Sequence, residues 1–310
     1  MVIKMKILLI RNDNIGDLIC TTPAIEALRK HFCNDQIDIV VNSYNECVIK
    51  NNPFINKIYS YTKPKHKKGV FQKLKAIFGK AKMLFEIYKT GYDTAVVFRT
   101  GYSASAELFA IVSRAKKIIG VGDKNGKSLI NDKVVFSGEH EVMFCFECLK
   151  SLGVRYNGEK TLFVPDAISE QYKDFVFFHI SSRISQNMLN DEQILDISKF
   201  LKAKFDNVVI TAEDPDFGQN ISKKSGIKYL KTSSFNELAS FLSGAKLLLS
   251  CDGGVMHLGP ALGVKTIGIL GKTDINRWSP WGAKCLQDES LVASNLNIQA
   301  VFDAVSEVMK

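Results

Sequence analysis

Short runs of apolar residues alternate with amphipathic stretches along nearly the whole chain. The runs are rich in Ile, Val, Leu and Phe, which predicts strands that are buried on both faces. We expect such strands at 6–10, 37–41, 94–98 and 117–121, and again at 175–180, 207–211, 227–230, 246–251 and 265–270. The stretches between them have helical spacing, and Asn190 and Ser234 stand as N-caps before two of them. The pattern predicts an α/β protein with parallel sheets covered by helices.

The alternation lapses between about residues 155 and 174 and restarts at Phe175. A chain of 310 residues is comfortable for two domains of about 150 residues each. We therefore expect two Rossmann-like α/β domains in tandem, 1–165 and 166–310, with a cleft between them. The pattern leaves open that the last helix packs back on the first domain.

Composition adds few constraints. No apolar run approaches the length of about 18 residues that a membrane span needs, and no secretory leader is recognisable, so we expect a cytoplasmic protein. Seven cysteines are scattered without a disulfide framework. Cys145 and Cys148 form a C-x-x-C, but no second pair follows at zinc spacing, and their segment reads as a buried helix. The sequence predicts neither a metal site nor a cofactor.

The positive charge is concentrated in one basic insertion. Residues 62–90 hold nine lysines and one glutamate, 9 − 1 = +8 of the net +9. Within it, 70–88 predicts an amphipathic helix bordered by Lys73, Lys75, Lys80 and Lys82, with an apolar face made of Val70, Phe71, Leu74, Ile77, Phe78, Ala81, Leu84, Phe85 and Tyr88. Two interpretations stay open: the face packs on the first domain, or it meets a membrane surface. Because no aromatic stacking platform or reading motif accompanies the lysines, nucleic-acid binding is disfavoured.

Two loops that follow predicted strands carry candidate chemistry. In the first, Asn14 and Gly16 precede Asp17, which either caps the following helix or acts as a general base. The second contains Asp252, Gly253, Gly254 and His257. Two glycines at a helix N-terminus suit an anion such as a diphosphate, although a glycine-rich turn beside a half-buried histidine is an equally good interpretation.

Two further loops are weaker candidates. Residues 269–282 hold two tryptophans, which predicts a loop that is folded against a neighbouring domain or a ligand. The loop after the strand at 175–180 begins Ser181-Ser182-Arg183, whose hydroxyl and guanidinium groups suit phosphate oxygens.

Three motifs occur in order: R-N-D-N-I-G-D-L-I-C-T-T-P-A-I-E-A-L, D-G-G-V-M-H-L-G-P-A-L-G and G-K-T-D-I-N-R-W-S-P-W-G. Together they make the chain resemble glycosyltransferase family 9, which includes the heptosyltransferases of the bacterial lipopolysaccharide core. The resemblance implies a GT-B fold and inverting, metal-independent transfer from a nucleotide-sugar donor, typically ADP-heptose. It implies a lipid-linked or phosphorylated glycan acceptor at the inner face of the inner membrane. It also makes Asp17 the general base, and it assigns donor binding to Ser182, Arg183, Asp252, Gly253, Gly254, His257, Thr273 and Asp274.

The chain departs from the family pattern in two places. A lysine that commonly meets the diphosphate is replaced by Gln186, and the usual G-P-T-D reads Gly271-Lys272-Thr273-Asp274. Arg183 or Lys272 could supply the missing charge. A different nucleotide sugar, a sugar-nucleotide epimerase of the same fold, and a non-catalytic sugar-nucleotide-binding protein remain alternatives.

Overall fold

The computed structural model describes residues 5–63, 69–123 and 125–310. The chain divides into two compact units, Met1–Glu159 and Lys160–Lys310, and each is described by itself. The division falls shortly before the domain boundary that we placed at 165/166. In the described ranges, no helix is both long and apolar enough to cross a bilayer.

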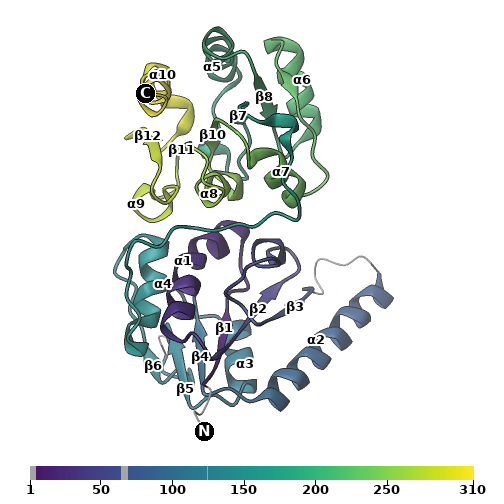
Figure 1. The fold of residues 1–310 in the computed structure, drawn as a ribbon, viewed down its shortest axis with the longest axis vertical. Helices are drawn as coiled ribbons and strands as arrows, with labels where there is room; N and C mark the ends of the chain where they lie inside the picture. The colour runs from purple at the N-terminus through teal and green to yellow at the C-terminus, as the bar shows by residue number, and fades with distance from the viewer. Residues whose placement is uncertain (1–4, 64–68, 124) are drawn as a thin grey trace. The chain divides into compact units, whose positions relative to one another are not determined.

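The first unit contains a parallel sheet in the order β3-β2-β1-β4-β5-β6. Its strands are β1 (Lys6–Ile10), β2 (Gln36–Asn42), β3 (Lys57–Tyr61), β4 (Thr94–Val97), β5 (Lys117–Gly120) and β6 (Asp132–Lys133). Its helices are α1 (Ile15–His31), α2 (Val70–Thr90), α3 (Ala104–Val112) and α4 (Glu141–Leu149), with short 3-10 turns at Glu46–Val48 and Lys150–Leu152. Helices α2 and α3 share one apolar core with the sheet, while α1 and α4 pack together (Figure 1).

The second unit repeats this strand order. Its parallel sheet runs β12-β11-β10-β7-β8-β9, which is the same 3-2-1-4-5-6 arrangement read from the other edge. The strands are β7 (Val176–His179), β8 (Val208–Thr211), β9 (Lys228–Tyr229), β10 (Leu247–Cys251), β11 (Thr266–Leu270) and β12 (Lys284–Gln287). The helices are α5 (Asp191–Lys204), α6 (Pro215–Ser225), α7 (Phe235–Leu242), α8 (Gly254–Ala261), α9 (Ile275–Trp278) and α10 (Ile298–Val308). Three 3-10 turns lie at Glu170–Tyr172, Ser185–Asn187 and Ala293–Asn295.

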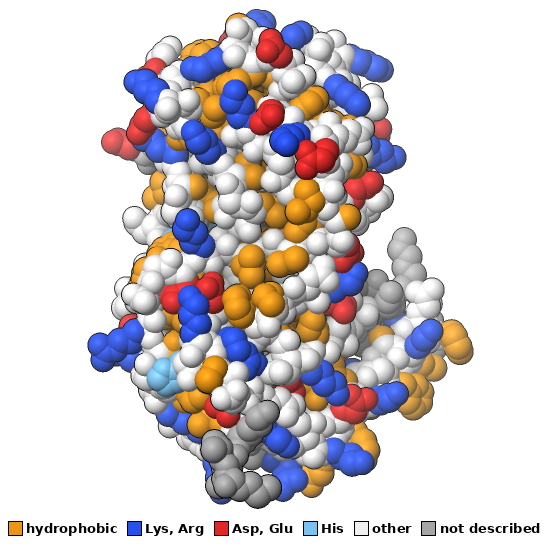
Figure 2. All heavy atoms as spheres, viewed as in Figure 1, with side chains coloured by type: hydrophobic (Ala, Val, Ile, Leu, Met, Phe, Trp, Pro, Cys, Tyr) orange, Lys and Arg blue, Asp and Glu red, His pale blue; other side chains and the backbone are white. Residues whose placement is uncertain are grey.

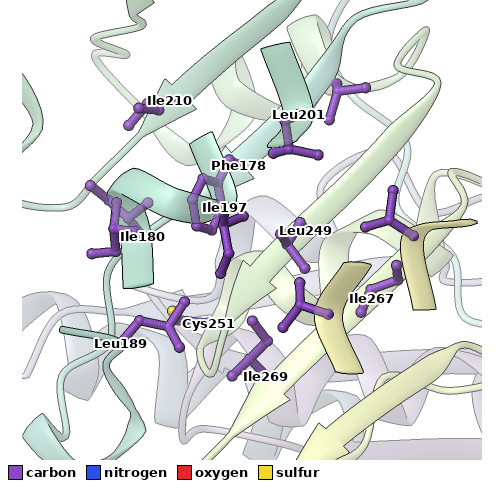
Figure 3. Packing of buried hydrophobic residues seen from close by; sticks show 14 of the residues in the cluster. Phe178, Ile180, Leu189, Ile197, Leu201, Ile210, Leu249, Cys251, Ile267 and Ile269 are labelled. Atoms are coloured by element: carbon purple, nitrogen blue, oxygen red, sulfur yellow. The ribbon is translucent and has the colours of Figure 1, made fainter. Parts of the chain in front are cut away.

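One core of the second unit lies between its sheet and α5. Phe178, Leu249 and Ile267 come from three neighbouring strands and converge with Ile197 and Leu201 of α5 (Figure 3). The last helix contributes Val301, Ala304 and Val305 to this same core. Its buried face therefore belongs to the second unit, whereas the sequence pattern leaves open that this helix packs back on the first domain.

The predicted α/β class and all nine predicted strands are confirmed, and so is the N-cap at Asn190, which forms a full capping box with Gln193. Ser234 caps α7 by accepting from the backbone N–H of Glu237. Cys145 and Cys148 are buried in α4, as expected. The strands β3, β6 and β12 were not predicted, and all three are short or half-polar strands at sheet edges.

The basic segment forms the predicted helix, and the structure contradicts one of the two interpretations of its apolar face. Helix α2 is anchored in the first core by Met83 and Ile87, neither of which belongs to the predicted apolar face. The interpretation in which that face packs on the domain is contradicted, because most of its large members, including Phe71 and Phe78, are exposed. Residues 64–68 of the basic insertion lie outside the described residues.

Candidate active site

Each sheet brings two loops together at the point where its strand order reverses. In the first unit, the chain continues from β1 towards one edge of the sheet and from β4 towards the other edge. Because β1 and β4 are neighbours, the loops that follow them meet at the carboxyl end of the sheet. In the second unit, β7 and β10 have the same relation. The candidate residues lie on or beside these loops, which we call the first site and the second site.

Arg11 is the centre of the first site. It directly follows β1, and its side chain is fully buried. One amino group donates to the carbonyl oxygen of Phe98, which directly follows β4, so the guanidinium ties the two loops of the switch point. The other amino group, Nη2, lies 2.7 Å from Oε1 of Glu141, the first residue of α4. Its Nε lies 3.0 Å from Oδ1 of Asp13.

Asp17 is held by the same arginine. Its Oδ1 lies 3.0 Å from Nη2 of Arg11, and its side chain is 15% exposed. Asn14, not Asp17, occupies the N-cap position of α1, and Asp17 stands in the first turn. The carboxylate is therefore oriented by a buried guanidinium rather than used as the cap, and a small part of it faces solvent. This geometry suits a group that must accept a proton from a bound molecule.

The first site carries more negative than positive charge. Three carboxylates, of Asp13, Asp17 and Glu141, surround Arg11, and Arg99 adds a second, more distant cation 3.7 Å from Asp13. Burial raises the pKa of Asp13 to about 7, against the attraction of Arg11 and with further repulsion from Asp17. Although burial opposes its charge, the carboxylates raise the pKa of Arg11, so the arginine stays ionised. The cluster consequently holds a proton on Asp13 more readily than an ordinary aspartate does.

Asn187 organises the second site. It is fully buried at the end of the 3-10 turn that follows β7. Its Nδ2 donates to Oδ2 of Asp252 at 2.6 Å and to Oγ1 of Thr273 at 2.7 Å, and its Oδ1 accepts from the backbone N–H of Gly271 at 3.1 Å. Thr273 Oγ1 also donates to Oδ2 of Asp252 at 2.7 Å. One amide side chain thus joins the loops after β7, β10 and β11.

The close approach of these loops requires glycine at 271. A Cβ built on Gly271 would overlap the backbone carbonyl of Gln186. Burial raises the pKa of Asp252, while the hydrogen bonds from Thr273 and Asn187 lower it. The half-buried carboxyl is therefore a structural acceptor for the loops as well as a candidate ligand group.

Helix α8 presents its N-terminus next to this network. Gly253 is its N-cap, with open space where a side chain would be, and Gly254 is its first residue. Backbone N–H groups at such a helix start favour an anion. His257 lies one turn inside and is buried, and its ring lies 6.2 Å from that of Trp278 in an edge-to-face arrangement. One of the two loop tryptophans thus packs on the histidine of the predicted anion site.

The other predicted donor residues have local contacts of their own. Arg183 is exposed, and its Nε lies 3.7 Å from Oε2 of Glu213. Ser182 accepts a 3.4 Å hydrogen bond from the backbone of Ile184. Asp274 caps α9 by accepting from the backbone N–H of Asn276 at 3.0 Å. The side chains of Lys272 and Gln186 are exposed on the loops that Asn187 ties together.

Three central residues were missed by sequence reasoning. Arg11 stands inside the first motif, and its position directly after an apolar strand was the available signal for a buried, paired arginine. Asn187 had a similar signal, because a polar residue followed by Met188 and Leu189 in a post-strand loop is a candidate for a buried hydrogen-bonding group. Glu141, 130 residues from Arg11, had none. Within the described ranges, no group of three or more His, Cys, Asp and Glu side chains is placed to hold a metal ion.

Two doubly wound sheets, each with polar groups gathered at its switch point, define a GT-B α/β protein. The fold is that of Escherichia coli heptosyltransferase WaaC with ADP-2-deoxy-2-fluoro heptose, at a TM-score of 0.79 over 98% of this chain and 99% of that one, with 16% identity. Residues 222–300 match the model of glycosyltransferase family 9 (heptosyltransferase).

Curated relatives extend the match over the chain. Lipopolysaccharide heptosyltransferase 1 of Campylobacter coli is 23% identical over 96% of this chain and 95% of its own length. Lipopolysaccharide heptosyltransferase 3 of Escherichia coli (strain K12) is 20% identical over 88% of this chain and 84% of its own. The chain is therefore similar to glycosyltransferase family 9 over residues 222–300 and to lipopolysaccharide heptosyltransferases over most of its length, in line with the resemblance carried by its three motifs.

Proposed function

We propose that the chain is an inverting, metal-independent heptosyltransferase that moves heptose from ADP-heptose to a lipopolysaccharide-core or related cell-surface glycan. The observation that carries the proposal is the pairing of a partly exposed Asp17 with a fully buried Arg11 at the switch point of the first unit. The lipopolysaccharide heptosyltransferases among the relatives support the sugar and the acceptor. The similar WaaC structure contains ADP-2-deoxy-2-fluoro heptose, an analogue of ADP-heptose, and this supports ADP-heptose as the donor.

Asp17 acts as the general base in this proposal. The guanidinium of Arg11 fixes the carboxylate and sets the direction in which it meets an acceptor hydroxyl. As the hydroxyl oxygen attacks the anomeric carbon, its proton passes to Asp17 and the bond from that carbon to the diphosphate breaks. A positioned base of this kind contributes about 10²–10⁴-fold to the rate. The nearby carboxylates of Asp13 and Glu141 share the positive charge of Arg11 with Asp17.

The second unit binds the donor. The helix start at Gly253 and Gly254 receives the diphosphate through backbone N–H groups, and His257 on the same helix donates to a phosphate oxygen. Asp252 and Thr273 are held at the same place by Asn187 and contact the sugar side of the donor. Ser182, on the loop after β7, and Asp274, on the loop after β11, add further polar groups for donor binding.

The role of the missing family lysine is taken by a cation from the neighbouring loop. Lys272 lies between Gly271 and Thr273, whose backbone N–H groups both donate to Asn187, so its backbone is fixed beside the site. Arg183 reaches the same phosphates only by leaving its exposed ion pair with Glu213, which costs little. We therefore expect Lys272→Ala to weaken ADP binding more than Arg183→Ala does, as measured by calorimetry.

The acceptor in this proposal is a lipid-linked or phosphorylated glycan, and the enzyme works at the inner face of the inner membrane. The basic helix α2 supports this placement, because its lysines would attract both phosphates and anionic lipid.

The decisive experiment measures transfer by Asp17→Asn with ADP-heptose and a lipopolysaccharide-core acceptor. The rate should fall by about 10²–10⁴-fold, while the calorimetric affinity for ADP stays unchanged. Glu26→Gln is the matched control, because Glu26 lies on the same helix and makes a surface ion pair with Lys30. Substantial activity of Asp17→Asn, or loss of ADP binding by it, would contradict the base assignment. ADP released without an acceptor would favour hydrolysis of the donor instead of transfer.

A further inference from the structure

Helix α2 carries an apolar face that the described part of the first unit leaves largely exposed, with Arg114 5.2 Å from the ring centre of Tyr88 at its end. Phe71, Phe78 and Phe85 are 81%, 71% and 61% exposed, and Leu74, Ile77 and Tyr88 are about half exposed. Isolated exposed apolar residues are ordinary, but a contiguous set along one helix marks an interaction site. Figure 2 shows hydrophobic side chains (orange) together with Lys and Arg side chains (blue) on helix α2, which lies at the right of the view.

The face has a seven-residue repeat in which a lysine accompanies each phenylalanine. Phe71, Phe78 and Phe85 are spaced by seven, and Lys75, Lys82 and Lys89 each follow one of them by four residues. Seven residues are nearly two full helical turns, so each set forms a row along the helix, and residues four apart are neighbours on its surface. The last pair shows the contact directly, because the ammonium of Lys89 lies 5.7 Å from the ring centre of Phe85. The result is a row of aromatic rings beside a row of ammonium groups.

The opposite side of the helix fastens it to the unit. Met83 and Ile87 are buried in the first core. Lys80 also faces inward, with its ammonium 5.2 Å from the ring centre of Phe109. The exposed row is therefore not available for packing on this unit, because the helix cannot turn it inward without withdrawing these residues.

The charge of the helix selects the occupant. From Val70 to Thr90 the helix has five lysines and one glutamate, 5 − 1 = +4, and that glutamate, Glu86, lies 3.1 Å from Lys57 of the neighbouring strand. A second copy of the same face would bring lysine rows against each other without acidic partners. A surface that is apolar in depth and anionic at its boundary, as an anionic bilayer is, matches both rows at once.

We infer that the exposed face of α2, made of Phe71, Leu74, Lys75, Phe78, Lys82, Phe85, Tyr88 and Lys89, docks the enzyme on an anionic lipid bilayer. The phenylalanine rings enter the boundary between headgroups and acyl chains, and the lysines beside them bind lipid phosphates while their stems stay in contact with the rings. The inference rests on the proposed function only in its biological purpose, which is to bring the first site to a lipid-linked acceptor.

The test is co-sedimentation of the full chain with vesicles of phosphatidylcholine alone or mixed with phosphatidylglycerol. Two variants remove one row each: Phe71→Gln, Phe78→Gln and Phe85→Gln together, or Lys75→Gln, Lys82→Gln and Lys89→Gln together. Glutamine keeps good helix propensity, so α2 should remain folded, and circular dichroism checks this.

Each row variant has a matched control away from α2. Leu129→Gln, Val135→Gln and Ile168→Gln together remove three apolar side chains that are 61%, 80% and 70% exposed but do not share one helix face. Lys199→Gln, Lys223→Gln and Lys231→Gln together remove three exposed lysines of the second unit.

The wild-type chain should sediment with the mixed vesicles, and its partitioning should fall with added salt. Each row variant should partition at least about tenfold less, while both controls behave as the wild type. Unchanged binding by either row variant would overturn the inference. A wild-type dimer that the phenylalanine variant converts to a monomer would overturn it too, since a second copy would then cover the face.

Transfer to a lipid-free core glycan separates this inference from the proposed function. Both row variants should retain that transfer, because their residues do not belong to either site. Vesicle binding by a chain that transfers no sugar would leave the docking surface standing and refute the proposed function. Sugar transfer by a chain that does not bind vesicles would support the proposed function and refute the docking surface.

Discussion

Removing the buried guanidinium of Arg11 is the most informative single perturbation of the first unit. Arg11→Met keeps much of the side-chain volume but leaves Asp13, Asp17 and Glu141 without their shared cation. It also deprives the carbonyl of Phe98 of its donor, and with it the tie between the loops after β1 and β4.

The magnitude follows from this loss. Deleting one partner of a buried ion pair costs about 3–5 kcal/mol, because the remaining charge is buried and unpaired. An unsatisfied carbonyl adds about 1 kcal/mol. Since protonation relieves the carboxylates, the penalty should be largest above pH 7 and should shrink towards pH 5.

Urea unfolding measures the effect with an internal reference. Both tryptophans, Trp278 and Trp281, lie in the second unit, so their fluorescence follows that unit while far-UV circular dichroism follows the whole chain. Arg11→Met should lower the midpoint seen by circular dichroism more than the midpoint seen by fluorescence. Arg99→Met is the matched control, because Arg99 is partly exposed and 3.7 Å from Asp13, and it should cost at most about 1 kcal/mol.

Two results would refute this reasoning. The first is a cost for Arg11→Met below about 1 kcal/mol at pH 8, which would mean that the carboxylates do not depend on the arginine. The second is a failure of Glu141→Gln to recover part of the loss when it is combined with Arg11→Met. If Arg11→Met does not fold, Arg11→Lys keeps the charge and should fold, and its transfer rate should drop because an ammonium cannot bridge Asp17 and Phe98 together.

Three further predictions concern the two sites. Asn187→Ala should weaken ADP binding about 10–100-fold in calorimetry by releasing three loops, whereas Gln186→Ala, at an exposed neighbouring position, should change it little. Gly271→Ala should destabilise the second unit by about 3 kcal/mol or more in urea, because its Cβ meets backbone, while Gly101→Ala, with open space around its Cβ, should be nearly neutral. The raised pKa of Asp13 means that the folded state binds the proton more tightly than the unfolded state, so stability should fall as pH rises from about 4 through 7; Asp13→Asn should flatten this slope in thermal melts taken across that range.

The general architecture was predictable because burial leaves a strong local pattern. A strand covered on both faces is apolar throughout, which is why β1, β7 and β10 were predicted within a residue or two of their ends. Edge strands lose that pattern. In β3 only two of five residues are buried, and in β12 no residue is buried.

The candidate groups were predictable to the extent that they lie next to strand ends. Asp17 and Asp252 were found for this reason. The partners that fix them were not, because Arg11 meets Glu141 across 130 residues and Asn187 meets Thr273 across 86. The buried face of helix α2 could not be predicted for a different reason. The broad apolar stripe of this helix is exposed, whereas its narrow buried stripe includes Lys80, whose ammonium lies over aromatic rings.

The ties made by Arg11 and Asn187 have a consequence for recombination between this chain and its relatives. Each tie joins the loop of a unit's first strand to the loop of its fourth, and both of its ends lie inside one unit. A crossover placed between residues 159 and 160 would therefore cut neither network. Under the proposed function, the donor site and the acceptor site then lie on separately exchangeable units, and replacing the second unit by that of a relative should change nucleotide-sugar choice while the Arg11 network stays intact.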